Sequence, residues 1–465
     1  MRFSSLPFLF GFLPITLAIY FAVPLRWRNL ALLLTSLVFY GWGEPVYISI
    51  MVLSILIDYT HGLLVERCKR RDNDRGARMA VASSIVFNLA LLLFFKYWDF
   101  LAASLQAVGL NFMPVLNIHL PIGISFYTFQ TMSYTIDVYR GDTRAQRSII
   151  NFGTFVTLFP QLIAGPILKY KDLGDQIDQR DCTAEKFASG VQLFMVGMGK
   201  KVLLANNVGL LWERYKALPP DQLTVAGAWL GVIAFTFQIY FDFSGYSDMA
   251  IGMGQMLGFY FPENFNYPYT AASVTEFWRR WHISLTTWFR EYLYIPLGGS
   301  RKGTWRTVRN IFLVWFCTGF WHGASWNFIL WGLHFFVWLM LEKYLLRDFL
   351  QKLPSWLRHF YTLVVVFVGW GVFAMEDLTV CAGYYKTCFG SGTLWSAADG
   401  YYLTAYGLTL LLLTVGSTRL PKKGWDRLPE RTRDLLGPLL MTAGLVICTA
   451  YLVDGSYNPF LYFRF

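Results

Sequence analysis

The chain has 465 residues, of which 55% are hydrophobic and 18% aromatic, and its mean hydropathy is +0.40. One soluble domain cannot bury this much apolar surface, so the composition indicates a polytopic membrane protein. The formal charge is +11, but the basic residues gather in short loops beside apolar runs. This distribution favours a role in membrane orientation over nucleic-acid binding.

Apolar runs with few or no charges recur along the whole chain. In chain order they cover residues 3–25, 30–40, 46–57, 79–95, 223–241, 311–341, 361–375, 401–415 and 436–453. Because roughly 20 apolar residues span a bilayer as a helix, we expect about ten to twelve membrane segments, some of them short or re-entrant. The first run lacks a small-residue cleavage site, so we expect it to be retained as a helix.

Three short basic loops orient the chain. They lie at residues 67–78, 301–309 and 419–433. Loops rich in Lys and Arg beside membrane spans mark the cytoplasmic face. Counting outward from them predicts that the N-terminus and the C-terminal residues 454–465 both lie outside the cytoplasm.

Polar and aromatic residues alternate within the apolar stretch at 237–248. The polar positions of interest are Gln238, Tyr240, Asp242 and Ser244. A polar side chain in a medium of low dielectric constant needs a partner. These residues either line a channel or form hydrogen bonds between helices, and the sequence leaves both alternatives open.

Residues 275–294 form a pattern typical of one amphipathic helix at the membrane interface. Trp and Phe fill one arc, Arg and other polar residues fill the opposite arc, and 296–299 contain the Pro and Gly that end the helix. His282 lies at the border of the apolar arc, one turn from Trp278 and Leu285. Either it has a function there or it satisfies a backbone carbonyl.

The run 311–341 contains no Asp, Glu, Lys or Arg, yet it holds His322. An ionisable side chain in such a segment is costly and indicates a functional site. These 31 residues would form about 46 Å of helix, more than one crossing needs. Basic residues flank both ends, so we expect a hairpin or broken helix with Trp321-His322-Gly323 near its inner end, close to mid-membrane.

The chemistry available to such a histidine is general base catalysis. A neutral imidazole in a dry cavity can take a proton from a hydroxyl while that hydroxyl attacks a thioester, provided that the partners are aligned and water is excluded. The six cysteines are scattered without metal-ligand spacing. We therefore predict no metal site and no permanently bound cofactor.

Two sequence motifs together resemble the signature of the membrane-bound O-acyltransferase superfamily, and more narrowly its bacterial alginate O-acetyltransferase branch. They are W-R-R-W-H-I-S-L at 278–285 and G-F-W-H-G-A-S-W at 319–326. Supporting matches lie at 159–166, 241–248, 292–299 and 459–465. The resemblance extends from about residue 120 to the C-terminus.

The resemblance implies an all-α ring of transmembrane and re-entrant helices around a thinned centre, crossed by a tunnel. It implies one membrane-embedded domain over 1–465, made of N-terminal helices (1–110), a catalytic core (120–345) and C-terminal helices with an extracytoplasmic aromatic tail (357–465).

The resemblance also assigns roles to residues. His322 occupies the position of the catalytic histidine, and His282 that of the second, donor-side residue of the signature. Arg279 and Arg280 would face the cytoplasm and attract an anionic donor. Tyr462 in the aromatic tail is either an acyl relay or an anchor in the headgroup belt.

The activity implied is membrane O-acetylation of an exopolysaccharide of the alginate kind or of a cell-wall glycan, in the bacterial inner membrane. The donor would be acetyl-CoA or an acyl-carrier protein thioester, and an extracytoplasmic SGNH-hydrolase-like acetyltransferase would be the partner. Within the same class, D-alanyl transfer to teichoic acid from a carrier protein is the alternative. A transporter or flippase is an alternative from another class; it predicts an inverted repeat, and none is visible in the sequence.

Overall fold

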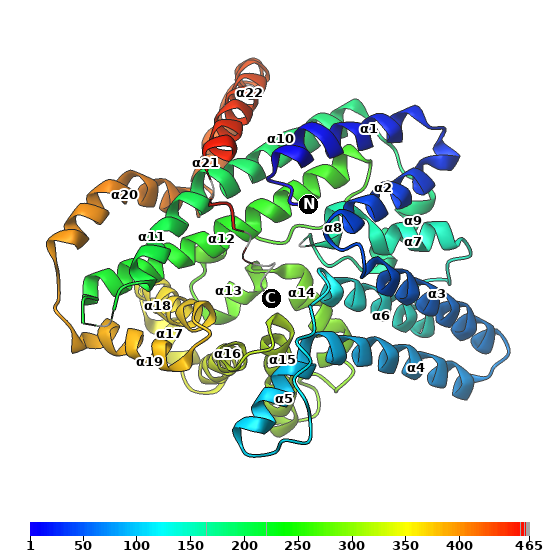
Figure 1. Ribbon diagram of the computed structural model, residues 1–465, viewed down its shortest axis with the longest axis horizontal. Coiled ribbons are helices and arrows are strands. Elements are labelled where there is room, and N and C mark those ends of the chain that lie inside the picture. Colours follow the sequence, from blue (N-terminus) through cyan, green and yellow to red (C-terminus); the bar gives the residue numbers. More distant parts are fainter. Residues whose placement is uncertain (164, 220, 456, 460, 462–465) are drawn as a thin grey trace. The chain divides into compact units, whose positions relative to one another are not determined.

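The computed structural model describes the chain except residues 164, 220, 456, 460 and 462–465. Within the described residues every regular element is a helix (Figure 1). The chain divides into two compact units, Met1–Phe194 with Tyr246–Pro262, and Met195–Gly245 with Glu263–Phe465. The predicted all-helical class is confirmed, whereas the single domain over 1–465 stays a prediction.

The first unit is built from the N-terminal helices. In chain order they are η1 (Phe8–Phe12), α1 (Leu13–Ala22), η2 (Leu25–Trp27), α2 (Arg28–Gly43), α3 (Ile48–Arg70), α4 (Asp74–Leu92), η3 (Leu93–Tyr97), α5 (Trp98–Ala107), α6 (Ile124–Arg140), α7 (Ile149–Thr157), α8 (Phe159–Leu162), α9 (Tyr170–Asp178) and most of α10 (Ala184–Gly199). The side chain of Asn73 caps α4 by accepting a hydrogen bond from the amide of Gly76.

A buried polar cluster joins α3 and α4 in this unit. The carboxylate of Asp58 accepts hydrogen bonds from Ser84 Oγ at 2.6 Å and from Asn88 Nδ2 at 2.8 Å. All three side chains are fully buried. Each carboxylate oxygen therefore has a donor, which is the usual condition for a polar group inside a protein.

The second unit holds both sequence motifs. Its helices are the end of α10, η4 (Lys200–Ala205), α11 (Asn206–Lys216), most of α12 (Val225–Met256), η5 (Pro268–Thr270), α13 (Val274–Arg280), α14 (Ile283–Phe289), η6 (Arg290–Tyr294), α15 (Thr304–His322), α16 (Trp326–Tyr344), α17 (Arg347–Lys352), α18 (Ser355–Ala374), α19 (Leu378–Lys386), η7 (Thr387–Ser391), α20 (Ala397–Gly416), α21 (Leu420–Asp426) and α22 (Glu430–Asp454).

Several helices are long and apolar enough to cross a membrane. Among the described residues there are 6, or up to 7 if the bent pair α20 and α21 makes one span. The six cover Ile48–Arg70, Asp74–Ala107, Ala184–Lys216, Val225–Met256, Ser355–Ala374 and Glu430–Asp454. The chain is thus a multi-pass membrane protein, and the count of ten to twelve segments stays a prediction.

The predicted hairpin around His322 is confirmed. Helices α15 and α16 lie side by side (Figure 1), and the turn between them comprises residues 323–325. Gly319 and Gly332 let the two backbones touch, because a Cβ on Gly319 would meet the carbonyl oxygen of Phe328 and one on Gly332 that of Trp315. His322 is the last residue of α15, directly before this turn.

The single amphipathic helix predicted for residues 275–294 is wrong. The segment is broken after Arg280, and His282 adopts a left-handed backbone conformation with φ +44°. The irregular segment at 264–266 supplies hydrogen-bond partners at this break: the amide of Asn266 donates to the Arg280 carbonyl, and the Asn264 carbonyl accepts from the amide of Ile283. These tertiary bonds replace the helical ones, which a helical periodicity cannot reveal.

Candidate active site

His322 lies in an aromatic setting at the end of α15. Its ring packs against Trp331 of α16, with centroids 4.9 Å apart and planes at 89°, and against Phe373 of α18 at 5.5 Å. The neighbouring ring of Trp321 is at 5.0 Å. Only 3% of His322 is exposed. The imidazole is thus held by rings from three helices, in surroundings of low polarity.

His282 lies at the break between α13 and α14 and has polar partners. Its Nδ1 is 3.2 Å from Asn264 Oδ1, which also accepts hydrogen bonds from the amide and the hydroxyl of Ser284. A carbonyl oxygen can only accept, so Nδ1 carries the hydrogen, and Nε2 is the nitrogen with the lone pair. The carbonyl that Nδ1 contacts is thus the side-chain carbonyl of Asn264.

Burial also favours the neutral form of the His282 imidazole. The residue is 1% exposed, and desolvation lowers the pKa of the His282 imidazole to about 3. It lies between α12 and α15, outside the candidate spans. The ring is therefore neutral throughout the physiological pH range. Its left-handed backbone costs of order 1–2 kcal/mol, a strain that clusters at functional sites.

The structure brings the two histidines together. Both line one cavity of about 90 Å³, together with aromatic residues of α13 and α14 and Thr318 of α15. The ring of Trp321 lies beside both imidazoles, 6.2 Å from His282 and 5.0 Å from His322. We call this space the histidine cavity.

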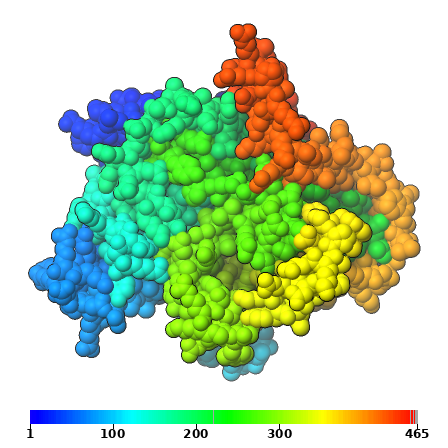
Figure 2. Space-filling view, turned by 180° about the vertical axis from the view of Figure 1, so that it is seen from behind, coloured from blue at the N-terminus to red at the C-terminus, as the bar shows by residue number. Residues whose placement is uncertain are grey.

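A larger cavity of about 680 Å³ shares walls with the histidine cavity. Trp278, Thr286, Val314 and Trp315 line both. Figure 2 shows the molecule hollowed among the green to yellow segments, which belong to the second unit. We call this larger space the basic cavity, after the cationic side chains on its wall, which come from five elements: Arg279, Arg290, Lys343, Arg347 and Arg358.

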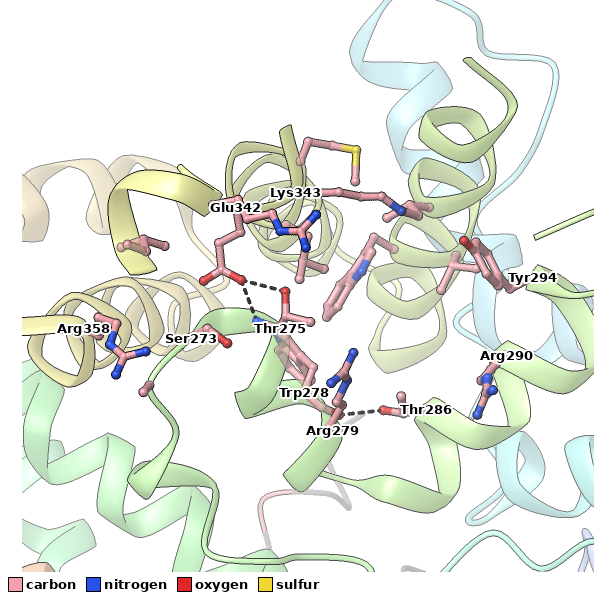
Figure 3. Close-up of a pocket in the computed structure, with 18 of the residues that line it drawn as sticks. Ser273, Thr275, Trp278, Arg279, Thr286, Arg290, Tyr294, Glu342, Lys343 and Arg358 are labelled. Carbon is pink, nitrogen blue, oxygen red and sulfur yellow. Dashed lines mark hydrogen bonds between the residues drawn. The ribbon is translucent and has the colours of Figure 1, made fainter. Parts of the chain in front are cut away.

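Figure 3 shows four of these cations, Arg279, Arg290, Lys343 and Arg358, on the wall of the basic cavity. Cationic walls of a cleft attract an anionic ligand and raise its local concentration. One carboxylate, Glu342, is also on the wall, but it is engaged: it accepts hydrogen bonds from the amides of Val274 and Thr275 and from the Thr275 hydroxyl. Glu342 thereby caps α13, the helix that carries Trp278 and Arg279.

The two predicted donor-side arginines differ in their surroundings. Arg279 lines the basic cavity. Arg280 is paired with Glu276 and donates a hydrogen bond to the Thr270 hydroxyl at 2.8 Å, and it is not among the residues lining this cavity. Arg279 can thus meet a ligand, whereas Arg280 ties α13 to the preceding segment.

The polar residues of α12 do not line the three cavities described here. Gln238 donates to the hydroxyl of Tyr457 at 3.1 Å, and Asp242 forms an ion pair with Lys201. Tyr240 packs among the rings of Phe241, Phe265, Tyr269 and Trp281, and Ser244 is buried. Gln238 and Asp242 thus form bonds within the second unit, and their role as lining residues stays a prediction.

A third cavity, of about 410 Å³, includes Phe373 and Leu461 in its lining. Phe373 is the same residue whose ring packs on His322. The residue after Leu461, Tyr462, lies outside the described residues, so its predicted role stays a prediction. Among the described residues no group of three or more His, Cys, Asp or Glu is placed to hold a metal ion.

Sequence reasoning missed three residues that shape the site. Asn264 fixes the tautomer of His282, Glu342 caps α13, and Phe373 closes one side of His322. Asn264 lies in an irregular loop and has no periodicity to mark it. Glu342 directly follows the apolar run 311–341, at its charged end. From the sequence alone, a carboxylate that faces the protein interior at such a position cannot be distinguished from one that faces solvent.

Comparisons with known proteins show the family to which this chain belongs. The sequence profile of the membrane-bound O-acyltransferase family matches residues 141–382. A probable alginate O-acetylase AlgI of Azotobacter vinelandii is 45% identical over 89% of this chain and 83% of its own length. A peptidoglycan O-acetyltransferase of Helicobacter pylori is 32% identical over 81% and 78%. A teichoic acid D-alanyltransferase of Bacillus subtilis is 24% identical over 73% and 89%.

The matched region contains both histidines and most of the walls of the basic cavity and the histidine cavity. This chain belongs to the membrane-bound O-acyltransferase family.

Proposed function

We propose that this chain is a membrane O-acetyltransferase that takes an acetyl group from a cytoplasmic thioester and delivers it for O-acetylation of an alginate-like exopolysaccharide or a cell-wall glycan. The observation that carries the proposal is that His282 and His322 line one small cavity, which shares walls with a larger basic one. The relatives named for alginate and peptidoglycan O-acetylation support the choice of acetyl group and glycan.

His322 is the proposed general base. It takes the proton of the acceptor hydroxyl while the hydroxyl oxygen attacks the thioester carbon, forming a C–O bond. The C–S bond then breaks, and the leaving thiolate receives the proton from the imidazolium of His322. The aromatic rings around His322 exclude the water that would otherwise hydrolyse the thioester.

His282 is the proposed positioning group for the thioester. Its neutral ring, oriented by Asn264, shares the histidine cavity with His322. At roughly 30 Å³ for one water in the liquid, a cavity of about 90 Å³ holds a group of a few non-hydrogen atoms. An acetyl group fits this size.

The basic cavity is the proposed entrance for the donor. Its arginines and lysine suit the phosphates of acetyl-CoA or the acidic surface of an acyl-carrier protein. We infer that the protein lies in the inner membrane of a bacterial cell and that the basic cavity opens to the cytoplasm. A tunnel would then lead past the histidines to the extracytoplasmic face of the membrane. The apolar runs support ten to twelve spans or re-entrant segments, and the basic loops support a topology with both termini outside the cytoplasm.

On the outer side we propose two further participants. The first is an SGNH-hydrolase-like acetyltransferase that completes delivery to the glycan. The second is Tyr462 of the aromatic tail, whose hydroxyl would accept the acetyl group as an ester and pass it on. The alternative for this tyrosine, an anchor in the headgroup belt, predicts no tyrosine ester in protein incubated with donor.

D-alanyl transfer from a carrier protein is the second candidate within the class. The relative named for it is less similar than the two named for O-acetylation, which favours the acetylating branch. A transporter would require a different use of the histidines, since it would move a substrate without breaking a thioester.

The test is transfer from labelled donors into membrane vesicles containing the purified protein. We expect the acetyl group of acetyl-CoA or of an acetylated carrier protein to leave its thiol when a glycan acceptor and the partner are present. D-alanyl carrier protein should be a poor donor. Thiol release from D-alanyl carrier protein alone would support the second candidate, and uptake of intact donor without thiol release would support a transporter.

A further inference from the structure

The strongest unexplained feature of the second unit is a buried ion pair that ends on the C-terminal tail. Lys201 Nζ of η4 lies 2.7 Å from Asp242 Oδ1 of α12, and the two side chains are 1% and 2% exposed. A buried ion pair is favourable only when its remaining donors and acceptors are also satisfied. The contacts of both side chains therefore show what the pair is built to hold.

The tail supplies the missing partners of the pair. Lys201 Nζ also donates to Asn206 Oδ1 at 2.7 Å and to the backbone carbonyl of Pro459, so the tail supplies one of the acceptors of this ammonium. Asp242 Oδ2, the other carboxylate oxygen, accepts the amide of Leu461 at 2.9 Å. The cation thus binds a tail carbonyl and the anion a tail amide.

Two side-chain contacts extend this binding toward α22. Gln238 donates to the hydroxyl of Tyr457, and Asn206 Nδ2 donates to Asn458 Oδ1 at 3.2 Å. Gly209 makes room for this arrangement, because a Cβ there would lie 2.9 Å from the Tyr457 hydroxyl and still closer to the Gln238 amide. The contacts cover residues 457–459 and 461, and all of them belong to the second unit.

Among the described tail residues, Leu461 lies near the candidate active site. Leu461 lines the third cavity together with Phe373, and the ring of Phe373 packs on His322. No other part of the proposed mechanism uses Lys201 or Asp242, although ionised groups this deeply buried are expensive to keep. Their position is explained if the tail must be held at this place during transfer.

We propose that the buried Lys201–Asp242 pair is a docking site for the backbone of the C-terminal tail, and that this docking positions the tail next to the His322 side of the active site. Lys201 and Asp242 are positioning residues, since they contact the tail and not the reacting atoms. Docking of the tail does not depend on the proposed function. Only the effect of docking on the rate of acetyl transfer rests on the proposed function.

The first test measures docking without turnover. Chymotrypsin cuts after aromatic residues and Leu, so intact-mass spectrometry of the purified full-length protein follows cleavage within the tail. Cleavage of a segment that must first detach tracks the population of the detached state. We expect cleavage at least about tenfold faster in Asp242→Asn and Lys201→Gln than in the unchanged protein. The matched control is Asp426→Asn, the same change at an exposed position of α21.

Two further variants guard against misfolding caused by an unpaired buried charge. Lys201→Met with Asp242→Leu removes both charges together, and Gly209→Val leaves the pair intact but occupies the space of the Tyr457 hydroxyl. Both should release the tail. Equal cleavage rates in these variants and in the unchanged protein would overturn the docking site, whatever the activity of the protein.

The second test asks what docking does for transfer. With the tail released, we expect kcat to fall at least about tenfold while the KM for the donor stays within about twofold, since the basic cavity is untouched. Rescue is expected from Lys201→Arg, which keeps the cation. Release of the tail with kcat unchanged would overturn the positioning role. If the unchanged protein transfers no acetyl group from any donor, the proposed function fails, while tail protection still decides the docking site.

Discussion

Two buried polar sites in this molecule look alike in the sequence and differ in the structure. Asp58 of the first unit and the histidines of the second all lie within or beside long apolar segments, and all are almost completely buried. Both oxygens of Asp58 receive hydrogen bonds from Ser84 and Asn88, and Asp58 lines none of the cavities described here. The histidines share the wall of a cavity.

Burial of an ionisable group is therefore not by itself evidence of a functional site. A carboxylate whose oxygens are satisfied within its own helix cluster stabilises helix packing. A histidine at a cavity wall can reach a ligand. The rule that an ionisable residue in an apolar segment marks a functional site would select Asp58 and His322 equally. The two residues differ in that His322 lines a cavity described here and Asp58 does not.

The largest expected effect comes from His322→Ala. A general base contributes about 10²- to 10⁴-fold to a rate, so we expect acetyl transfer to fall by at least about 10². Donor binding should remain, because the basic cavity is unchanged. The measurement is transfer from labelled acetyl-CoA, with His61→Ala in the first unit as a control that removes a histidine lining none of these cavities. Normal transfer in His322→Ala would reject the base assignment.

A smaller effect is expected from Asn264→Leu. This change removes the acceptor for Nδ1 of His282 and leaves the ring free to turn or to change tautomer. We expect kcat/KM to fall about tenfold, equivalent to about 1.4 kcal/mol. His282→Ala should cost at least as much, and the double variant should lose no more than His282→Ala alone. Additive losses would show that Asn264 acts elsewhere.

The pH dependence of the transfer activity tests whether His282 is neutral. Because burial lowers the pKa of the His282 imidazole to about 3, this ring gains its proton only near that pH. Between pH 5 and 8 its charge does not change, so the activity should show no inflection that depends on His282. A profile whose acid limb near pH 6 disappears in His282→Gln would contradict the buried, neutral ring.

Substitution of the two neighbouring arginines, Arg279 and Arg280, should affect donor binding differently. Arg279→Ala removes a cation from the wall of the basic cavity, so we expect the KM for acetyl-CoA to rise several-fold at low salt and less at high salt, where screening weakens attraction. Arg280→Ala should leave the salt dependence of KM unchanged, because Arg280 is paired with Glu276. Equal salt dependence in both variants would remove the distinction.

The smallest effect on catalysis is expected at Asp58. Asp58→Asn places an amide opposite the donors of Ser84 and Asn88, and a buried donor without an acceptor costs about 1–3 kcal/mol. The midpoint of thermal unfolding should therefore fall, while kcat per folded molecule stays unchanged. A large loss of kcat without loss of stability would show that Asp58 has a function and would break the comparison.

Much of the fold could be predicted from the sequence. Apolar runs gave the helical membrane class, and the unusual length of 311–341 with its central small residues predicted the hairpin at His322, because these features are local. The pairing of the two histidines came from the resemblance and not from spacing: forty residues separate them, and no helical or strand period relates them.

The rest depends on tertiary contacts that a sequence does not display. The break at His282 is made by hydrogen bonds from residues 264–266, so the periodic pattern of 275–294 predicted one helix where two occur. Likewise Asp242 and Gln238 had two open alternatives, since a polar residue on an apolar helix looks the same whether it faces a channel or the tail.

The central claim is that the acyl group reacts in the histidine cavity. A structure of the full-length protein with a non-hydrolysable acetyl-CoA analogue tests it most directly. We expect the phosphates to lie among the cations of the basic cavity and the acyl carbon to lie between His282 and His322. An analogue bound elsewhere, with its acyl carbon out of reach of His322, would contradict it.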